Sequence, residues 1–324
     1  MSNSKKLFTL LFTSVLLSAC GTANDSKAQS DNSELEKLTI GVLQVSASAP
    51  IPYGIEEGIF EKHGLDVEIA DSQGGAAMLP AVEAGTFDIG VMSPISVLIA
   101  NDRGLDMRIV SGFSYAYPEG DDVNGVVVRK DSGIESIKDL AGLDTAVNLL
   151  QTQSDLALLG AMENLGGDPN TLNFVEVPFP DMAVQLEQEN IDAAYLPYPF
   201  LSAALEDPEN MLLDYPLQHS VPGMPMFVSV ASSEFVEKNP ETIQKFYTAL
   251  EEVMDSANAN EDAIRELLPN FMGLPPEAAG DILLDVIPWE VVNTRGRKKT
   301  SGKDGVYHNT HQSGGLQCPT LMHR

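Results

Sequence analysis

Two glycines and a serine stand at the starts of predicted helices, where they could bind an anion. Gly74 and Gly75 open one apolar helical run, and Ser93 with Pro94 opens the next after a short buried strand. Glycine lets a ligand approach the first N–H groups of a helix, which have no partner within it. Ser93 suits the N-cap position and Pro94 the first helical position. We expect both helix starts at the ends of neighbouring parallel strands, where α/β sheets bind ligands; ordinary α/β packing is the alternative.

The sequence contains no motif in which residues typical of catalysis or metal binding have a characteristic spacing. The five histidines are scattered along the chain: His63, His219, His308, His311 and His323. No Ser-His-Asp arrangement emerges, and the two cysteines, Cys20 and Cys318, have no metal-ligand spacing. We therefore expect no catalytic residue, no cofactor and no metal, and we interpret the chain as a binding protein rather than an enzyme.

Length and charge limit the class of protein. The chain has 324 residues, of which 43% are hydrophobic, and is long enough for two domains with separate cores. Its formal net charge of −28 argues against binding to nucleic acid and against direct adhesion to an anionic membrane surface. Only the N-terminus contains a markedly apolar run.

That N-terminus has the pattern of an export signal. Two lysines precede an apolar run over residues 7–17, which is too short for a transmembrane helix. The sequence LSACG that follows resembles a bacterial lipobox, which implies lipidation of Cys20 and cleavage just before it. We expect residues 1–20 to be a lipoprotein signal peptide and the polar residues 21–37 to be a flexible tether.

Strands and helices alternate over the next part of the chain, which predicts parallel βαβ units. The expected strands cover residues 38–45, 65–70, 87–92 and 107–111, and the expected helices between them cover 50–62, 74–84 and 93–103. A polar, aromatic loop is expected over 113–124, and the strand 125–129 is expected to leave this lobe.

The alternation restarts after residue 130. Strands are expected over residues 145–149, 171–177 and 191–196, with helices that begin near 151, 181 and 197. Asp181 is expected to cap its helix. A return strand over 223–231 and a largely helical segment over 232–271 complete the pattern.

Short motifs in a fixed order resemble one known family. They are GIEEGIF at 54–60 with GLDV at 64–67, GTFDIG at 85–90, VRKDSGI at 128–134, DLAG at 139–142 and IDAA at 191–194. Together they resemble the solute-binding proteins of ABC importers for nitrate, sulfonates, taurine and thiamine-precursor pyrimidines. The resemblance covers about residues 38–270.

The resemblance implies a periplasmic-binding-protein-like α/β fold. Two α/β lobes with open, mostly parallel sheets would be joined by two crossing segments, with the ligand in a cleft that closes on binding. The strands 125–129 and 223–231 are the candidate crossings. The expected divisions are lobe 1 at 38–128, lobe 2 at 129–222, the return crossing with C-terminal helices packing on lobe 1 at 223–292, and a basic tail at 293–324.

The tail differs in character from the acidic chain before it. It is Gly-rich, without periodicity, and contains the basic residues Arg295, Arg297, Lys298, Lys299, Lys303 and Arg324. We hypothesise an out-of-frame or foreign C-terminus that is disordered and has no role. A native basic tail that touches anionic lipid or wall polymer is the alternative.

When the binding positions of the family are carried over one by one to this sequence, the resemblance implies that the ligand lies against the starts of helices. The implied binding residues are Ser46, Ala47, Ser48, Gly74, Gly75, Ala76, Ser93, Pro94, Gln151, Thr152, Ser154, Tyr195 and Tyr198. Free N–H groups and helix dipoles bind an oxyanion there without a basic side chain. The nearby basic residues are expected to be solvated or structural: Arg103, Arg108, Arg129 and Lys130.

A flat ring is the alternative ligand. Four aromatic side chains could stack on it: Tyr53, Phe113, Tyr195 and Tyr198. We favour Tyr195 and Tyr198, because Pro197 and Pro199 stiffen their turn. The hydrogen bonds of a ring would come from Gln151, Gln153 or Asp181.

Together these observations predict an extracytoplasmic solute-binding lipoprotein of an ABC importer. It would capture a small sulfonate, nitrate or taurine-type solute and deliver it to a permease. We expect a monomer on the outer face of the cytoplasmic membrane, anchored only through Cys20 and without nucleic acid as a partner. Uptake of a thiamine-precursor pyrimidine is the alternative; a lipid-anchored sensor or adhesin and a pyrimidine-synthase-like enzyme are further ones.

Overall fold

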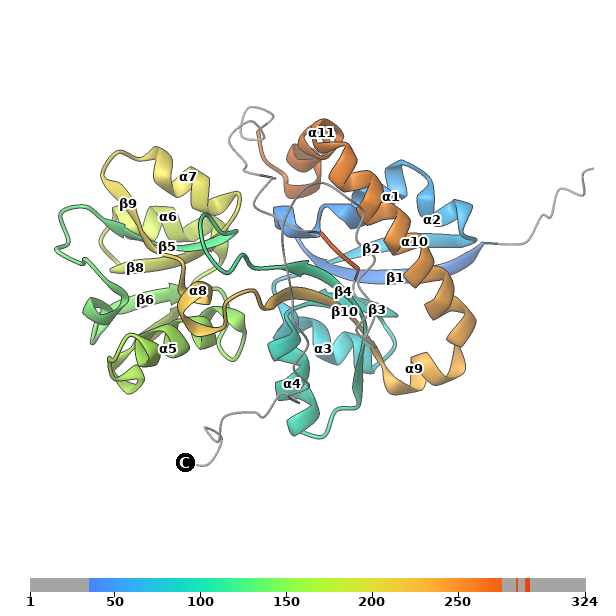
Figure 1. Cartoon of the computed structure of the whole chain (residues 1–324), viewed down its shortest axis with the longest axis horizontal. Coiled ribbons are helices and arrows are strands. Elements are labelled where there is room, and N and C mark those ends of the chain that lie inside the picture. Colours follow the sequence, from blue (N-terminus) through green and yellow to red (C-terminus); the bar gives the residue numbers. More distant parts are fainter. Residues whose placement is uncertain (1–34, 276–283, 285–288, 292–324) are drawn as a thin grey trace, which may run out of the picture. The chain divides into compact units, whose positions relative to one another are not determined.

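The computed structural model describes residues 35–275, 284 and 289–291, and it contains two five-stranded sheets. Figure 1 shows the helices and strands of the first sheet on the right and those of the second sheet on the left. The predicted signal peptide, Cys20 and the basic tail lie outside the described residues. Within those residues every helix is too short or too polar for a bilayer span.

The first sheet combines early strands with one from much later in the chain. Its order is β2-β1-β3-β10-β4. The strands are β1 (Glu36–Leu43), β2 (Leu65–Ser72), β3 (Ile89–Met92), β4 (Met107–Tyr115) and β10 (Pro225–Ser232). β1 pairs in parallel with β2 and β3, whereas β10 is antiparallel to β3 and β4. The expected tether ends slightly too late, because Glu36 and Lys37 already pair with β2.

Eight helical segments belong to this part of the structure. They are η1 (Ser46–Ser48), α1 (Pro50–Glu56), α2 (Ile59–Lys62), α3 (Gly75–Glu83), α4 (Pro94–Asp102), α9 (Ser233–Lys238), α10 (Pro240–Ala259) and α11 (Glu261–Met272). The single helix expected over 50–62 is divided, because Gly58 adopts a left-handed φ of 66° that ends α1. The Phe60 ring of the second piece stacks on Phe246 of α10, with centroids 6.4 Å apart.

The second sheet has the order β7-β6-β8-β5-β9. Its strands are β5 (Asn124–Arg129), β6 (Asp144–Val147), β7 (Asn173–Glu176), β8 (Ala193–Pro197) and β9 (Asn210–Asp214). The helical segments are η2 (Ile137–Leu140), α5 (Gln153–Asn164), η3 (Pro169–Thr171), α6 (Phe179–Glu187), α7 (Phe200–Glu206) and α8 (Pro216–Ser220). Asp181 is not the cap of α6, because this helix already begins at Phe179, after Pro178.

The two expected crossing strands lie within the sheets instead. β5 pairs with β8 and β9 in the second sheet, and β10 pairs with β3 and β4 in the first. The links between the sheets are therefore the segments before these strands, residues 116–123 and 221–224. The run of valines in β5 is fully buried, which suits a central strand rather than a linker. The lobe boundary expected at residue 128 thus falls inside β5.

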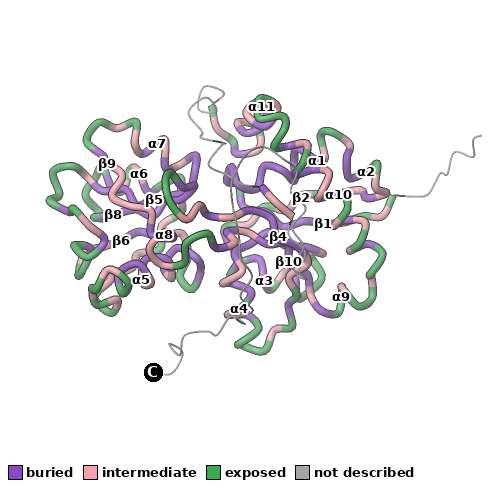
Figure 2. The backbone as a smooth tube through the Cα atoms, in the orientation of Figure 1, coloured by how far each residue is buried: buried purple, intermediate pink, exposed green. Residues whose placement is uncertain are grey.

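The loop expected over 113–124 also begins too early. β4 continues to Tyr115, and Phe113 within it is completely buried. Figure 2 shows the buried strands at the centre of each sheet and exposed residues on the outer turns and helix faces. A stacking role for Phe113 is therefore wrong, since its ring belongs to the core.

Candidate functional site

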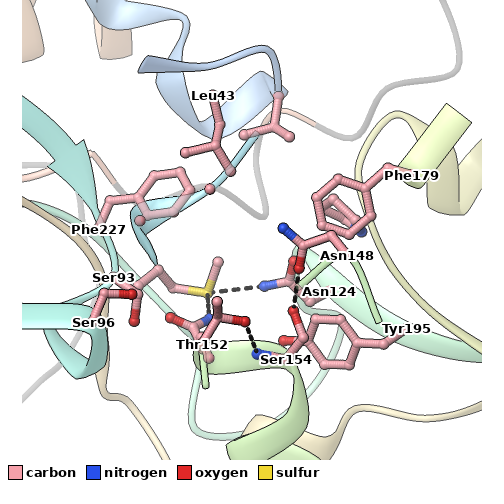
Figure 3. Close-up of a pocket in the computed structure, with 16 residues that line it drawn as sticks. Leu43, Ser93, Ser96, Asn124, Asn148, Thr152, Ser154, Phe179, Tyr195 and Phe227 are labelled. Atoms are coloured by element: carbon pink, nitrogen blue, oxygen red, sulfur yellow. Dashed lines mark hydrogen bonds between the residues drawn. The ribbon is translucent and has the colours of Figure 1, made fainter. Parts of the chain in front are cut away.

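A pocket of about 50 Å³ opens to solvent where strands of both sheets end. Residues after β1, β2, β3 and β6 meet there with residues of β5, β8 and β10 (Figure 3). The lining consists of Leu43, Val45, Gly74, Gly75, Ser93, Ser96, Asn124, Asn148, Thr152, Gln153, Ser154, Phe179, Tyr195, Pro197, Met226 and Phe227. This is the edge at which open α/β sheets bind ligands.

The start of α3 is the helix terminus best suited to an anion. Gly74 occupies its N-cap position, no side chain caps the first turn, and that turn contains no acidic residue. A Cβ atom at Gly75 would lie 2.5 Å from Ser96 Oγ, so a side chain there would obstruct the pocket. The main-chain N–H groups and the positive end of the α3 dipole therefore remain available at this wall.

The start of α6, at Phe179, has no side-chain cap but has Asp181 in its first turn, and the starts of α4 and α5 are capped. Ser93 Oγ accepts from the N–H of Ile95 at 3.3 Å at the start of α4, as the sequence predicts. At the start of α5, Thr152 and Asp155 form a capping box, and Asp155 accepts from the N–H of Thr152 at 2.9 Å. Burial raises the pKa of Asp155, although these N–H donors lower it. The carboxylate already faces the α5 dipole, which leaves α3 and α4 as the more positive wall.

None of the lining residues carries a charged side chain. The four nearby basic residues are outside the lining and have protein partners: Arg103 donates to the Gln151 side chain, Arg108 pairs with Glu237, Arg129 pairs with Asp131, and Lys130 donates to the Pro208 carbonyl. Among the described residues, no group of three His, Cys, Asp or Glu side chains could hold a metal ion.

Two polar atoms of the lining are buried and have no hydrogen-bond partner among the described residues. They are Ser96 Oγ and Gln153 Oε1. Burial raises the pKa of Tyr195, the negative charge of Asp122 raises it further, and a side-chain hydrogen bond with Gln153 lowers it. Unpaired buried polar atoms are costly in a folded protein, so their position in a pocket marks them as candidates for ligand contact.

The structure brings together about half of the sequence-predicted site residues. Those in the lining are Gly74, Gly75, Ser93, Thr152, Ser154 and Tyr195. Those outside it are Ser46, Ala47, Ser48, Ala76, Pro94, Gln151 and Tyr198.

The predicted residues outside the lining have identifiable structural contacts. Ser46 Oγ donates to the Tyr198 carbonyl at 3.1 Å, and the Ala47 carbonyl accepts from Trp289 Nε1 at 2.9 Å. Ser48 is completely buried, and Gln151 adopts a left-handed φ of 60°. The loop after β1 thus forms a packed turn, and only Val45 from it reaches the pocket.

Sequence reasoning missed most of the apolar lining and two amides. Asn148 follows β6 and Asn124 begins β5, so their positions at strand ends were a usable signal. Met226 and Phe227 carried no such signal, because β10 enters the first sheet from more than a hundred residues beyond β4. Tyr53, a candidate for stacking, instead lies in the core with its hydroxyl 2.8 Å from Ser256 Oγ.

Comparison with known proteins matches this chain to one family model and to periplasmic binding proteins. The model of the family described as "NMT1/THI5 like" matches residues 46–264. A putative ABC transporter periplasmic binding protein of Brachyspira hyodysenteriae is 28% identical over 279 residues, which covers 80% of this chain and 77% of the relative. The taurine-binding periplasmic protein of Escherichia coli is 24% identical over 230 residues, covering 71% of this chain and 69% of the relative.

The fold is also that of solved binding proteins. The crystal structure of the periplasmic aliphatic sulphonate binding protein of Escherichia coli superposes with a TM-score of 0.67 at 23% identity. The similarity covers 80% of this chain and 87% of that one. The expected periplasmic-binding-protein-like α/β fold is therefore confirmed.

Proposed function

The chain belongs to the NMT1/THI5-like family, and we propose that it is the solute-binding lipoprotein of an ABC importer for a small organic sulfonate or similar oxyanion. The pocket is its ligand site, and the bound solute passes from it to a cognate permease. The observation that carries this proposal is the uncapped start of α3 on a pocket whose lining has no charged side chain. Such a wall binds an anion through main-chain N–H groups and the helix dipole.

The apolar part of the lining suits an organic body. Leu43 and Phe227 line the upper part of the view in Figure 3, and Phe179 lies across from them, whereas Ser93 and Ser96 lie below. A separation of apolar and polar lining favours a solute with an anionic head and a carbon chain over a bare inorganic anion. Nitrate, which has no apolar part, would leave these side chains without contacts.

We extend the proposal to the location of the protein. Lipidation of Cys20 would hold it on the outer face of the cytoplasmic membrane, since several acyl chains on one residue anchor stably. It would act there as a monomeric binding protein without catalysis.

Calorimetry with the purified protein tests the ligand class. We expect propane-1-sulfonate to bind and to raise the melting temperature, because a ligand at about 100 times its Kd stabilises the native state by about 2.7 kcal/mol. Gly75→Val should weaken binding by about tenfold or more, since the new side chain would meet Ser96. Ala77→Ser, on the exposed side of the same helix, is the matched control and should bind as the wild type does.

A thiamine-precursor aminopyrimidine belongs in the same titration. Its ring could lie between Phe179 and Tyr195, with the amides of Asn124 and Asn148 as partners. Binding of the pyrimidine without binding of any sulfonate would overturn the oxyanion proposal in favour of this alternative. Turnover of either compound would overturn the non-enzymatic assignment.

A further inference from the structure

The first of the two links between the sheets, residues 116–123, is bonded at two points along its length (Figure 1). At its start the Ala116 N–H donates to the Met224 carbonyl, next to β10, at 2.9 Å. Further along, Gln218 Nε2 of α8 donates to the Gly120 carbonyl at 2.8 Å. Because the first bond lies at the end of the first sheet and the second belongs to α8, a change in the angle between the sheets has to be absorbed between residues 116 and 120.

The second link, residues 221–224, is bonded in the same way. The Val221 N–H continues α8 by donating to the Leu217 carbonyl at 2.9 Å, and the carbonyl of Met224 accepts the bond from the first link. Between these points Pro222 and Gly223 form a turn, closed by the N–H of Met224, which donates to the Val221 carbonyl at 3.2 Å. A change in the angle between the sheets therefore falls within this turn.

Each of these two short stretches contains a proline and then a glycine with a left-handed φ. They are Pro118 with Gly120, whose φ is 86°, and Pro222 with Gly223, whose φ is 70°. Proline has a fixed φ, whereas glycine adopts positive and negative φ about equally readily, so the glycine is the residue that can rotate. A Cβ atom at Gly223 would lie 4.0 Å from the Pro118 Cβ, so the two stretches lie side by side.

α8 is itself fixed on the helices and strands of the second sheet. Asn164 of α5 donates to the His219 carbonyl at 2.8 Å, and His219 Nε2 lies 3.0 Å from the carboxylate of Asp214 at the end of β9. A second side chain connects this region to the first link, since the hydroxyl of Tyr215, the residue before α8, donates to Asp121 Oδ1 at 3.1 Å. α8 and its N-cap therefore hold the first link in its present conformation through two side chains.

Both links lead directly into residues that line the pocket. Asn124 follows the first link at the start of β5, and Met226 and Phe227 follow the second link in β10. Among the described residues, the lining includes none from either link and none from α8. The links and α8 thus determine how the two sides of the pocket face each other without contacting what the pocket holds.

We propose that Gly120 and Gly223 are the two positions at which the backbone rotates when the pocket closes on a solute. Gln218 and Tyr215 are positioning residues that favour the closed conformation by holding the first link. The inference rests on the proposed function, because it explains how residues outside the pocket set part of the affinity for the solute. A solute that binds the closed conformation is bound more weakly whenever that conformation is less populated.

Gly120→Ala and Gly223→Ala test the two rotating positions. Alanine is unfavourable in the left-handed region, so each variant should shift the equilibrium away from the closed conformation. We expect the Kd of propane-1-sulfonate, measured by calorimetry, to rise about fivefold or more in each variant. Because closure retains the solute, the increase should appear mainly in the dissociation rate, measured by stopped flow.

Two glycines outside the links provide matched controls. Gly133 and Gly142 have φ values of 74° and 78°, and a Cβ atom at either would meet nothing within 4 Å, as at Gly120. Gly133→Ala and Gly142→Ala should therefore carry the same backbone strain and lower the melting temperature to a similar extent. Their Kd values should stay within about twofold of the wild-type value, because neither position lies between the two sheets.

Gln218→Ala and Tyr215→Phe test the positioning residues. Each variant loses one hydrogen bond to the first link, which should raise the Kd of propane-1-sulfonate about two- to tenfold. The Kd of ethanesulfonate should rise by the same factor, so that the ratio of the two values stays within about twofold, because the lining is unchanged. Gln185→Ala is the control: Gln185 is also half-buried, and its side chain accepts from Asn190 at the end of its own helix.

The outcomes separate this inference from the proposed function. If both glycine variants bind propane-1-sulfonate as tightly as the Gly133 and Gly142 variants do, rotation at the links is overturned while sulfonate binding by the wild type still supports the proposed function. An unchanged Kd in both α8 variants, or a changed ratio between the two sulfonates, overturns the role of Gln218 and Tyr215. If the wild type binds neither sulfonate, the proposed function fails and this inference fails with it.

Discussion

The side-chain amide of Asn148 donates to the main-chain carbonyl of Gln73, with an Nδ2–O distance of 3.1 Å. This bond joins the turn after β6 in the second sheet to the turn after β2 in the first, beside the pocket. Arg103 and Gln151 make a second contact of this kind. Direct bonds between the two sides of a binding site stabilise the conformation in which they touch, and so contribute to the affinity for a ligand held between them.

Arg103→Ala should weaken ligand binding without lowering stability. The side chain is exposed, and its bond to Gln151 joins the two sides of the site. Loss of this bond should lower the free energy that favours the closed conformation by about 0.5–1 kcal/mol, and so raise Kd about two- to fivefold. Calorimetry with propane-1-sulfonate measures this change. Arg129→Ala is the matched control, because Arg129 pairs with Asp131 only two residues away. If Arg103→Ala leaves Kd unchanged, the contact between Arg103 and Gln151 does not contribute to closure of the site.

Asp122→Asn should stabilise the protein at neutral pH. Burial raises the pKa of this carboxyl from 3.8 to about 6, so between these values the native state holds a proton that the unfolded state has released. The free energy of unfolding of the wild type therefore falls as the pH rises from about 4 to about 6. The variant should lack this decrease and exceed the wild type by about 1–3 kcal/mol at about pH 7.5.

Urea unfolding followed by circular dichroism at several pH values measures this difference. Asp121→Asn, at the exposed neighbouring position, should keep the pH profile of the wild type. A variant at residue 122 with the same slope between about pH 4 and 6 would contradict the assignment of this titration to Asp122.

Trp289→Phe should destabilise the first sheet and its helices. Trp289 Nε1 donates to the Ala47 carbonyl at 2.9 Å, and both residues are buried. Phenylalanine would leave that carbonyl unpaired, which costs about 1–3 kcal/mol. Denaturant unfolding measures the loss, and Tyr247→Phe on the partly exposed surface of α10 should change the free energy of unfolding by less than about 0.5 kcal/mol. Equal stability of the Trp289 variant and the wild type would show that the contact is dispensable.

Cys20→Ala should release the protein from the membrane. If the sequence at 17–21 is a lipobox, the cysteine is the only site of acylation, and a chain without lipid has no other anchor that the sequence predicts. Cell fractionation measures the distribution between membrane and soluble fractions. Ser18→Thr, a conservative change before the cysteine, serves as the control and should stay in the membrane fraction. Retention of the Cys20 variant would refute the lipid anchor.

Local signals are sufficient for much of the fold and part of the site. Ser93 and Pro94 begin α4, and Thr152 caps α5, because capping depends only on neighbouring residues. Gly74 and Gly75 likewise mark the start of α3 by residue type alone. Local patterns are insufficient where the decisive contacts come from distant residues, and β9 and α8 have no counterpart among the predicted elements.

The alternation of strands and helices and the helix starts that face the pocket follow from the order of the residues. Tertiary packing was needed to show that β5 and β10 are sheet strands rather than links, and that Met226 and Phe227 meet Asn124 and Tyr195 in one lining. The physical reason is that helix caps and strand patterns are set within a few residues, whereas strand order depends on burial between segments far apart in the chain.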